Sequence, residues 1–376
     1  MNKKVLFITE SLNIGGAEKA LLSILKEIDH TEFDVTVKVI SEKGAFLADL
    51  KSIHDVHAIF VVKEKNGRTA SLLNKFIVKA IYSWLPAKIV GNYLCRGYDV
   101  AVAFCEGYLT KWVGASSVKC RKIAWVHTDM VDNDWPLRTG VFKTLEEEID
   151  AYSRYDQVVG VTESVSEGMR NKFHCKNVTT VYNILDPQID SKADEQIPEL
   201  RRADLNLVGV GRLEEVKGFD ILIEAMNLLL NKECLDIQLT IVGDGSQRGR
   251  LAEMIDEYHL TGNVSLVGRK SNPYPYVKSA DVFVCPSRQE GFNIAILEAM
   301  SLGKPVVASK SVGPTEILKN GEYGILTKND AFSLAEGIKS IMTEGQFLLY
   351  SNKSKERIGD FDENVQLKKL YRLLDN

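Results

Sequence analysis

KVLFITESLNIGGAEKALLSILKEI, residues 4–28, combines three structural signals in one stretch. It opens with a β-type run over residues 4–9 and continues through a small-residue loop over residues 13–16. Apolar residues then recur at helical spacing. They are Ala17, Ala20, Leu21, Ile24, Leu25 and Ile28. The stretch predicts a strand, a glycine turn and an amphipathic helix, which is the opening unit of a parallel α/β sheet.

Strand-like runs recur through the first half of the chain. They lie at residues 33–40, 100–104, 123–127 and 157–161. The intervals between them are long enough for crossover helices, which parallel strands need. We therefore expect one doubly wound, Rossmann-like domain over residues 1–186. The end of the chain, residues 361–376, repeats apolar residues at helical spacing, so we expect a closing helix that docks an apolar face. The spacing does not say on which domain it docks, and we expect it to pack back on this one.

A polar, charged segment interrupted by two prolines predicts a linker over residues 187–204. After it the alternation of strands and helices restarts and predicts a second Rossmann-like domain over residues 205–360. The strand-like runs lie at residues 205–210, 237–242, 264–267, 282–285 and 306–309. Ligands of open α/β sheets bind beyond the carboxyl ends of the strands. Two such domains facing each other would enclose one cleft.

Composition excludes several classes of protein. The chain has 376 residues, of which 45% are hydrophobic, and a formal net charge of −4. It is too long for one small module, and its charge gives no general reason to expect a nucleic-acid partner. The six cysteines show no spacing typical of a zinc site or a disulfide framework. Because no apolar run is long enough for a signal peptide or a membrane span, we expect a cytoplasmic protein.

SRQEGFNIAILEAMSLGKP, residues 287–305, predicts a buried helix beginning near Gly291, because its residues are apolar almost all round. Glu298 lies in the middle of this helix, where a carboxylate needs partners. Glu290 lies just ahead of the helix, whose first backbone N–H groups offer a site for an anion, most simply a phosphate. The residues at this end are Gly291, Phe292 and Asn293. Alternatively, Glu298 pairs with a basic residue inside the domain and Glu290 only caps the helix.

VGRLEEVKGFD, residues 210–220, places Arg212 and Lys217 in a loop between a strand end and a helix. A guanidinium and an ammonium in that position suit a diphosphate. The alternative is a solvated loop in which both cations pair with Glu214 and Glu215.

Three other signals are less specific. The Gly15-Gly16 pair before a helix indicates either close approach of a ligand or a structural turn. His127 at a strand end is either a functional or a structural residue. The DND sequence at residues 132–134 matches a metal-binding pattern but follows no clean strand end, so we interpret it as a solvated acidic loop and expect no metal. GxGxxG is absent, which argues against NAD.

Residues 63–96 carry seven basic side chains and one acidic one, a local net charge of +6, with Phe76 and Trp84 among them. Such a combination is typical of a helix that lies on an anionic membrane surface. An ordinary helix with a solvated basic face is the alternative.

Taken together, these segments resemble the GT-B glycosyltransferases of the large retaining family 4, from GGAEK at residues 15–19 to the closing helix. VGRLEEVKG and the E-x7-E pattern from Glu290 to Glu298 are the most specific matches. AFCEGYLTK around Glu106 and WVHTD around His127 are similar to bacterial surface-polysaccharide members of that family.

The resemblance implies a donor site on the C-terminal domain, an acceptor site on the N-terminal one, and a reaction without a metal or other cofactor. It implies that Arg212 and Lys217 bind the donor diphosphate, that Glu298 binds the ribose and that Glu290 binds the transferred sugar. Other implied contacts are Gly16 to the phosphates, His127 to the sugar, and Gly268 with Arg269 to the base. The remaining implied residues are Gly15, Gly211, Gly291, Phe292, Asn293 and Ile294 for the donor, and Glu106 and Asp129 for the acceptor.

The resemblance thus implies a retaining glycosyltransferase that moves a sugar from a nucleoside diphosphate sugar, with a UDP-sugar favoured, to a glycan or lipid-linked acceptor in bacterial surface polysaccharide synthesis. We expect it in the cytoplasm, peripherally on the inner face of the plasma membrane. Two alternatives stay open. One is a nucleotide-sugar epimerase or hydrolase of the same fold, and the other is a catalytically silent nucleotide-sugar-binding subunit of a transferase complex.

Overall fold

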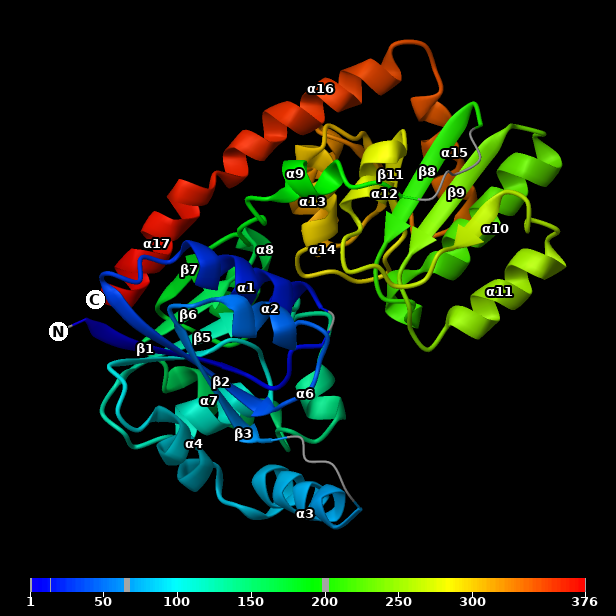
Figure 1. Cartoon of the computed structure of the whole chain (residues 1–376). Coiled ribbons are helices and arrows are strands. Elements are labelled where there is room, and N and C mark those ends of the chain that lie inside the picture. Colours follow the sequence, from blue (N-terminus) through cyan, green and yellow to red (C-terminus); the bar gives the residue numbers. More distant parts are fainter. Residues whose placement is uncertain (1, 14, 64–67, 198–202, 376) are drawn as a thin grey trace. The chain divides into compact units, whose positions relative to one another are not determined.

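The computed structural model describes residues 2–13, 15–63, 68–197 and 203–375 (Figure 1). The chain forms two compact units, each with its own parallel sheet. Unit 1 comprises Met1–Ile184 and Glu363–Asn376, and unit 2 comprises Leu185–Asp362. The predicted α/β class with two doubly wound domains is confirmed.

Unit 1 is built on seven parallel strands in the order β3-β2-β1-β4-β5-β6-β7. Central strand β1 is buried from Val5 onward because helices cover both faces of a parallel sheet. The strands are β1 (Lys3–Thr9), β2 (Phe33–Ser41), β3 (Val56–Val62), β4 (Val100–Ala103), β5 (Arg121–Val126), β6 (Gln157–Gly160) and β7 (Val178–Thr180).

The helices of unit 1 include α1, whose buried face is the apolar repeat seen in the sequence. They are α1 (Gly16–Glu27), α2 (Leu47–Ser52), α3 (Arg68–Lys79), the π-helix η1 (Ala80–Trp84), α4 (Ala87–Cys95), α5 (Tyr108–Ala115), α6 (Trp135–Arg138), α7 (Leu145–Ser153), α8 (Glu163–Asn171) and α17 (Glu363–Asp375).

The closing helix α17 belongs to unit 1 although it follows unit 2 in the chain. The Tyr371 ring stacks on Phe33 at a centroid distance of 5.6 Å. Its hydroxyl accepts a hydrogen bond from the Asp29 N–H at 3.1 Å and donates one to the Glu27 carbonyl at 3.3 Å. The backbone carbonyl of Leu373 accepts a bond from the Arg121 guanidinium. Apolar packing and directional bonds together hold the helix in register.

Unit 2 has six parallel strands in the order β10-β9-β8-β11-β12-β13. The chain winds outward from β8 to β10 and returns on the other side of β8 with β11, so the carboxyl ends of β8 and β11 lie side by side at the switch point of the sheet. The strands are β8 (Leu205–Val210), β9 (Ile237–Val242), β10 (Val264–Leu266), β11 (Val282–Cys285), β12 (Val306–Ser309) and β13 (Ile325–Thr327).

Helices α10, α11 and α15 enclose one apolar core against this sheet. The helices of unit 2 are α9 (Ile189–Ala193), the 3₁₀ turn η2 (Glu215–Lys217), α10 (Phe219–Asn227), the π-helix η3 (Leu228–Lys232), α11 (Arg248–Glu257), α12 (Tyr274–Ser279), α13 (Ile294–Ser301), α14 (Val312–Ile317), η4 (Lys319–Gly321), α15 (Ala331–Ile341), α16 (Gln346–Ile358) and η5 (Gly359–Phe361).

The segment expected to be a linker, residues 187–204, differs from that expectation in its first part. It forms α9, whose Ile189 and Ala193 are buried with Tyr274. Lys192 forms an ion pair with Asp186 at 2.7 Å. Burial of these two apolar residues outweighs the polar composition, so α9 folds as part of unit 2. Residues 198–202 of the expected linker lie outside the described residues.

Within the described ranges, every helix is too short or too polar to cross a lipid bilayer.

The contacts of Tyr371 predict a measurable loss on removal of its hydroxyl. Tyr371→Phe keeps the stacking on Phe33 but loses two hydrogen bonds, which costs about 1 kcal/mol. We expect the Tm to fall by roughly 2–4 °C. Tyr93→Phe is the matched control, since Tyr93 is 61% exposed. Equal melting of the two variants would contradict this account of α17.

Candidate functional site

Two loops meet at the switch point of unit 2. The first follows β8 and carries Arg212 and Lys217, and the second follows β11 and carries Glu290. The Lys217 ammonium lies 2.5 Å from Glu290 Oε1. Their side chains are 21% and 9% exposed, so this ion pair is largely shielded from water. The two charges come from strands distant in sequence but neighbouring in the sheet.

Glu290 is held by more than Lys217. Its Oε1 atom also accepts hydrogen bonds from the Ser287 hydroxyl at 2.9 Å and the Asn293 amide at 3.0 Å. All three bonds fall on one oxygen. In the described part of the chain, no hydrogen bond to Oε2 accompanies them. The carboxylate is therefore fixed in orientation, with one oxygen left for a further donor.

Gly218 allows the Lys217 loop to approach the β11 loop. It adopts a left-handed conformation with φ of 66°, and a Cβ atom there would lie 2.1 Å from the Pro286 carbonyl oxygen. Any other residue would be strained and would displace that carbonyl.

A second ion pair joins the same loops and was not predicted from the sequence. Arg288 donates to both oxygens of Asp220, at 2.8 and 2.7 Å, and to the Glu215 carbonyl at 2.6 Å. Burial raises the pKa of Asp220, but the hydrogen bonds and charge of Arg288 outweigh it and hold that pKa below its usual value. In the sequence, Arg288 is a single basic residue two positions before Glu290. No sequence pattern indicates that it pairs with Asp220.

The structure corrects the predicted start of the helix near Gly291. Helix α13 begins at Ile294, and Asn293 is its N-cap. The Asn293 side chain accepts from the N–H groups of Ala295 and Ile296. The first N–H groups of the helix are therefore those of Ala295 and Ile296 and are capped by Asn293, whereas Gly291, Phe292 and Asn293 precede the helix, and Glu290 does not cap it. Gly291, Phe292, Asn293 and Ile294 are all buried.

Glu298 is 3% exposed in the middle of α13. The Tyr274 hydroxyl donates to its Oε1 atom at 3.1 Å. Burial, and after it the charge of Glu298, raise the pKa of Tyr274 well above its ordinary value, so this tyrosine stays a donor. Tyr274 also packs on α9, a contact that no pattern in the sequence predicts.

The predicted glycines line up along the carboxyl edge of β8, β9 and β10. The Gly243 N–H donates to the Gly268 carbonyl at 3.0 Å, and a Cβ atom on Gly243 would lie 1.8 Å from the Gly211 carbonyl oxygen. Arg212 and Arg269, next to these glycines, are exposed. Arg212 forms no ion pair with the described residues, whereas Glu214 binds Ser246 instead of a cation. The edge combines close-packed backbone with two exposed guanidinium groups.

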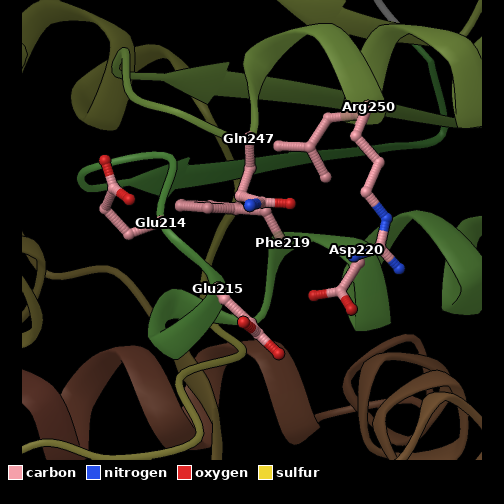
Figure 2. Close-up of a pocket in the computed structure, with 7 residues that line it drawn as sticks. Glu214, Glu215, Phe219, Asp220, Gln247 and Arg250 are labelled. Atoms are coloured by element: carbon pink, nitrogen blue, oxygen red, sulfur yellow. The ribbon is translucent and has the colours of Figure 1, made fainter.

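A shallow pocket lies beside the β8 loop, between α10 and α11 (Figure 2). Three carboxylates line it, from Glu214, Glu215 and Asp220, together with Phe219, Gln247, Arg250 and Leu251. Neither Lys217 nor Glu290 lines it, and its excess of carboxylates would repel a diphosphate. This pocket is distinct from the candidate site.

Unit 1 brings Glu106 and His127 together. Glu106 Oε1 accepts from the backbone N–H groups of His127 and Thr128. The His127 ring packs on Phe104 at 4.8 Å, and its Nε2 atom is buried with no hydrogen-bond partner. Burial lowers the pKa of His127 to about 3, so the imidazole is neutral at pH 7. Asp129 accepts from the Val131 N–H, which fixes the turn after His127.

The N-terminal glycines have a local role as well. Gly15 is the N-cap of α1 with extended backbone, and a Cβ atom there would meet Glu18 Oε2 at 2.2 Å. Gly16 opens the helix and is exposed.

Two glutamates of unit 1 that each have a buried Oε1 atom were missed from the sequence. Glu10 follows β1, and burial and then the charge of Glu18 raise its pKa to about 7. Glu148 on α7 is 1% exposed, and burial raises its pKa to about 7. Each has an Oε1 atom without a hydrogen-bond partner. The sequence LEEEID contains three consecutive glutamates, and nothing in it indicates which of their carboxyl groups is buried.

The DND loop also lies in unit 1. Arg138 contacts Asn133 and Asp134. Among the described residues no group of three or more His, Cys, Asp or Glu side chains is placed to hold a metal.

Two Rossmann-like domains, with cations and carboxylates at the switch point of the second, define a GT-B protein. The Anabaena protein HepE, solved in complex with UDP and glucose, is similar over 100% of both chains with a TM-score of 0.77 and 19% identity. Residues 190–360 match the family model described as "Glycosyl transferases group 1". This domain of the chain is thus similar to that family of transferases.

Curated relatives carry related names. A region of 184 residues is 32% identical to an uncharacterized glycosyltransferase of Methanocaldococcus jannaschii and covers 45% of each protein. A region of 191 residues is 28% identical to N-acetylgalactosamine-N,N'-diacetylbacillosaminyl-diphospho-undecaprenol 4-alpha-N-acetylgalactosaminyltransferase of Campylobacter jejuni, covering 50% of this chain and 51% of that protein. The chain thus matches about half the length of these curated relatives.

The fit of Gly218 against Pro286 generates a stability prediction. Gly218→Ala introduces a strained left-handed alanine and a clash, so we expect a loss of at least about 1 kcal/mol and a lower Tm. Gly249→Ala, in α11, meets no atom within 4 Å. This control should gain about 1 kcal/mol from helix propensity. A Gly218→Ala protein that melts at or above the wild type would refute the proposed loop contact.

The raised pKa of Glu148 generates a pH prediction. Between about pH 4.5 and 7 the folded protein keeps a proton on Glu148 that the unfolded chain has lost, so stability falls as pH rises through this window. Glu148→Gln has no such proton. We expect its Tm relative to wild type to rise by roughly 2–4 °C between pH 5 and pH 8, as about 1 kcal/mol would give.

Glu146→Gln on the same helix is the control. Glu146 is exposed, and its own backbone N–H together with Thr144 lowers its pKa. Its substitution should bring no gain at pH 8. A Glu148→Gln variant whose advantage stays flat with pH would show that this carboxyl is ionised in the folded protein.

Proposed function

We propose that this chain is a retaining glycosyltransferase. It would move a sugar from a nucleoside diphosphate sugar, with a UDP-sugar favoured, to a glycan or lipid-linked acceptor in bacterial surface polysaccharide synthesis. The observation that carries the proposal is the Lys217–Glu290 ion pair at the switch point of the sheet. In this proposal the Lys217 ammonium would bind the phosphates, and the neighbouring Glu290 carboxylate would bind sugar hydroxyls.

Lys217 and Arg212 would each bind a different phosphate of the donor diphosphate. An ammonium has three N–H donors, and Lys217 uses one of them on Glu290, so two remain for phosphate oxygens. Arg212 is exposed nearby and can bind a second phosphate with two parallel hydrogen bonds. Together they offset the charge of a diphosphate, so the proposal includes no metal or other cofactor.

The carboxylates would recognise the two sugars of the donor. Glu290 has Oε1 fixed by three donors, and Oε2 would accept from a hydroxyl of the transferred sugar. Glu298, bonded to Tyr274, would bind the ribose hydroxyls. The base would lie along the glycine edge near Gly211, Gly268 and Arg269, and the phosphates near Gly291. The residues from Phe292 to Ile294 would form the floor of the site.

The proposed reaction is the same-face transfer that the resemblance to the retaining family implies, with these charges stabilising the leaving phosphate. The bond between the sugar C1 atom and the β-phosphate oxygen breaks, and the phosphate takes the electron pair. Lys217 and Arg212 stabilise the charge that develops there. The acceptor oxygen attacks on the same face of the sugar and gives its proton to the leaving phosphate. No protein nucleophile is assigned, and the configuration at C1 is retained.

Unit 1 would bind the acceptor and the outer side of the donor. Neutral His127 would form a hydrogen bond with a sugar hydroxyl, because its Nε2 atom has no hydrogen-bond partner within the protein. Glu106 and Asp129 are the acceptor candidates, and Gly15 and Gly16 would border the phosphates. Two similar proteins support a nucleotide sugar as donor and a lipid-linked acceptor. HepE was solved with UDP and glucose, and the Campylobacter relative is named for a diphospho-undecaprenol acceptor. A lipid-linked acceptor would place the enzyme at the cytoplasmic face of the plasma membrane.

Lys217→Ala tests the proposal. Loss of one preorganised cation should lower kcat/KM for sugar transfer by roughly 10²–10³-fold. Donor choice is measured first, as the rise in Tm with UDP-, GDP- and ADP-sugars. A donor at about 100 times its Kd stabilises the protein by ~2.7 kcal/mol.

Lys232→Ala, an exposed lysine on η3, is the control and should transfer like wild type. Undiminished transfer by Lys217→Ala would overturn the assignment. Product formation without acceptor would identify an epimerase or hydrolase, and donor binding without turnover would identify a binding subunit.

A further inference from the structure

Large apolar side chains are exposed together on one segment of unit 1. They lie on α3, on η1, in the turn after η1 and on α4, and each is between 44% and 61% exposed. The set, called here the docking face, consists of Leu73, Phe76, Trp84, Leu85, Ile89 and Tyr93. An exposed cluster of this size marks an interaction surface.

The docking face is presented by a well-anchored element. On the opposite side of the same segment, Ile81, Val90 and Leu94 are buried. A Cβ atom on Gly91 would lie 2.0 Å from the Trp112 carbonyl oxygen, so α4 packs directly against α5. Figure 1 shows α3 and α4 at the end of unit 1 next to β3. Exposure of these apolar side chains is therefore a property of the folded domain and not of a frayed end.

The docking face carries positive charge with no neutralising partner. Lys75, Lys79, Lys88 and Arg96 are exposed, and residues 68–98 contain no Asp or Glu. In the part of the chain that the structure describes, none of the four forms an ion pair. The Lys79 ammonium lies over the Trp84 ring at 5.4 Å, and Trp84 packs edge-on against Phe76 at 5.0 Å. Cations surround aromatic rings, as in proteins that bind at the water–lipid boundary.

The combination of exposed apolar and basic side chains indicates which kind of partner fits the docking face. A face meant only for solvent would not expose Leu73, Leu85 and Ile89. A second copy of the chain would bring the same cations together across a symmetric interface. A nucleic acid offers phosphates but no apolar phase for the aliphatic side chains. An anionic lipid surface satisfies both requirements, since headgroups meet the cations and acyl chains meet the apolar residues.

We propose that the docking face binds the surface of an anionic bilayer, with α3, η1 and α4 lying in the headgroup region. The aromatic and aliphatic side chains enter the boundary of the acyl chains, and the four basic side chains contact the headgroups.

The docking face is coupled to the carboxyl edge of the unit 1 sheet. Tyr82, on η1, packs against Tyr108 at 4.8 Å and Trp112 at 5.0 Å. Burial, and after it the charge of Glu10, raise the pKa of Tyr82 above its ordinary value. Tyr108 opens α5 two residues after Glu106, so this packing brings η1 beside the loop that follows β4. Resting on the proposed function, this would deliver a lipid-linked acceptor close to Glu106 and His127.

Flotation of the full chain with vesicles tests the proposal. Vesicles of phosphatidylcholine alone are compared with vesicles of equal parts phosphatidylcholine and phosphatidylglycerol, at about 0.05 M and about 0.5 M NaCl. We expect the wild type to float with the anionic vesicles at low salt only. Phe76→Ser/Trp84→Ser and Lys75→Glu/Lys79→Glu should each reduce the bound fraction at least about tenfold.

Leu348→Ser on α16 is the control, since Leu348 is 64% exposed in unit 2. It should float like wild type. Equal flotation with both vesicle types, wild-type flotation of the variants, or binding of a single-stranded oligonucleotide in place of vesicles would overturn the proposal. The donor-induced rise in Tm needs no membrane, so its loss in wild type would count against the transferase function and not against the docking face.

Discussion

The ammonium of Lys217 and the carboxylate of Glu290 lie 2.5 Å apart in a mostly buried position, and the proposed donor site depends on this pair. A carboxylate removed from water is stable only with donors around it, and Glu290 has three on one oxygen. The geometry requires close approach of two loops, which Gly218 permits and the Arg288–Asp220 pair reinforces. An interaction that stabilises the empty site thus also orients the groups that would bind the donor.

Both domains use the same topology for different chemistry. In each sheet the first and fourth strands of the unit are neighbours, so residues after them meet at one edge. In unit 2 that edge holds exposed cations and close-packed glycines, which suit a phosphate-rich ligand. In unit 1 it holds Glu10, Glu106 and His127, where buried carboxyls and a neutral imidazole suit hydroxyl groups.

The match to the transferase family falls on residues 190–360, entirely within unit 2. Such a distribution agrees with the division of roles that we propose. Nucleoside diphosphate sugars share a diphosphate and a ribose, so the residues that bind them recognise the same chemical groups in every donor. Acceptors and membrane surfaces vary, and unit 1 carries the features specific to them, namely the docking face and the neighbouring carboxyl edge. The proposed donor site and the proposed membrane contact therefore lie in different compact units.

The sequence by itself determined the fold class, and its short motifs predicted the residues of the proposed donor site. Alternation of strand and helix periods predicts parallel sheets, and Arg212, Lys217, Glu290 and Glu298 occur in short motifs. Tertiary structure decided which groups meet. It paired Lys217 with Glu290 and not with Glu214 or Glu215, assigned the helix cap to Asn293, turned Glu10 and Glu148 inward, and folded α9 onto Tyr274. Which side chains pair depends on the order of the strands in the sheet and on how far each group is removed from water. Neither can be read from residues that are neighbours in the sequence.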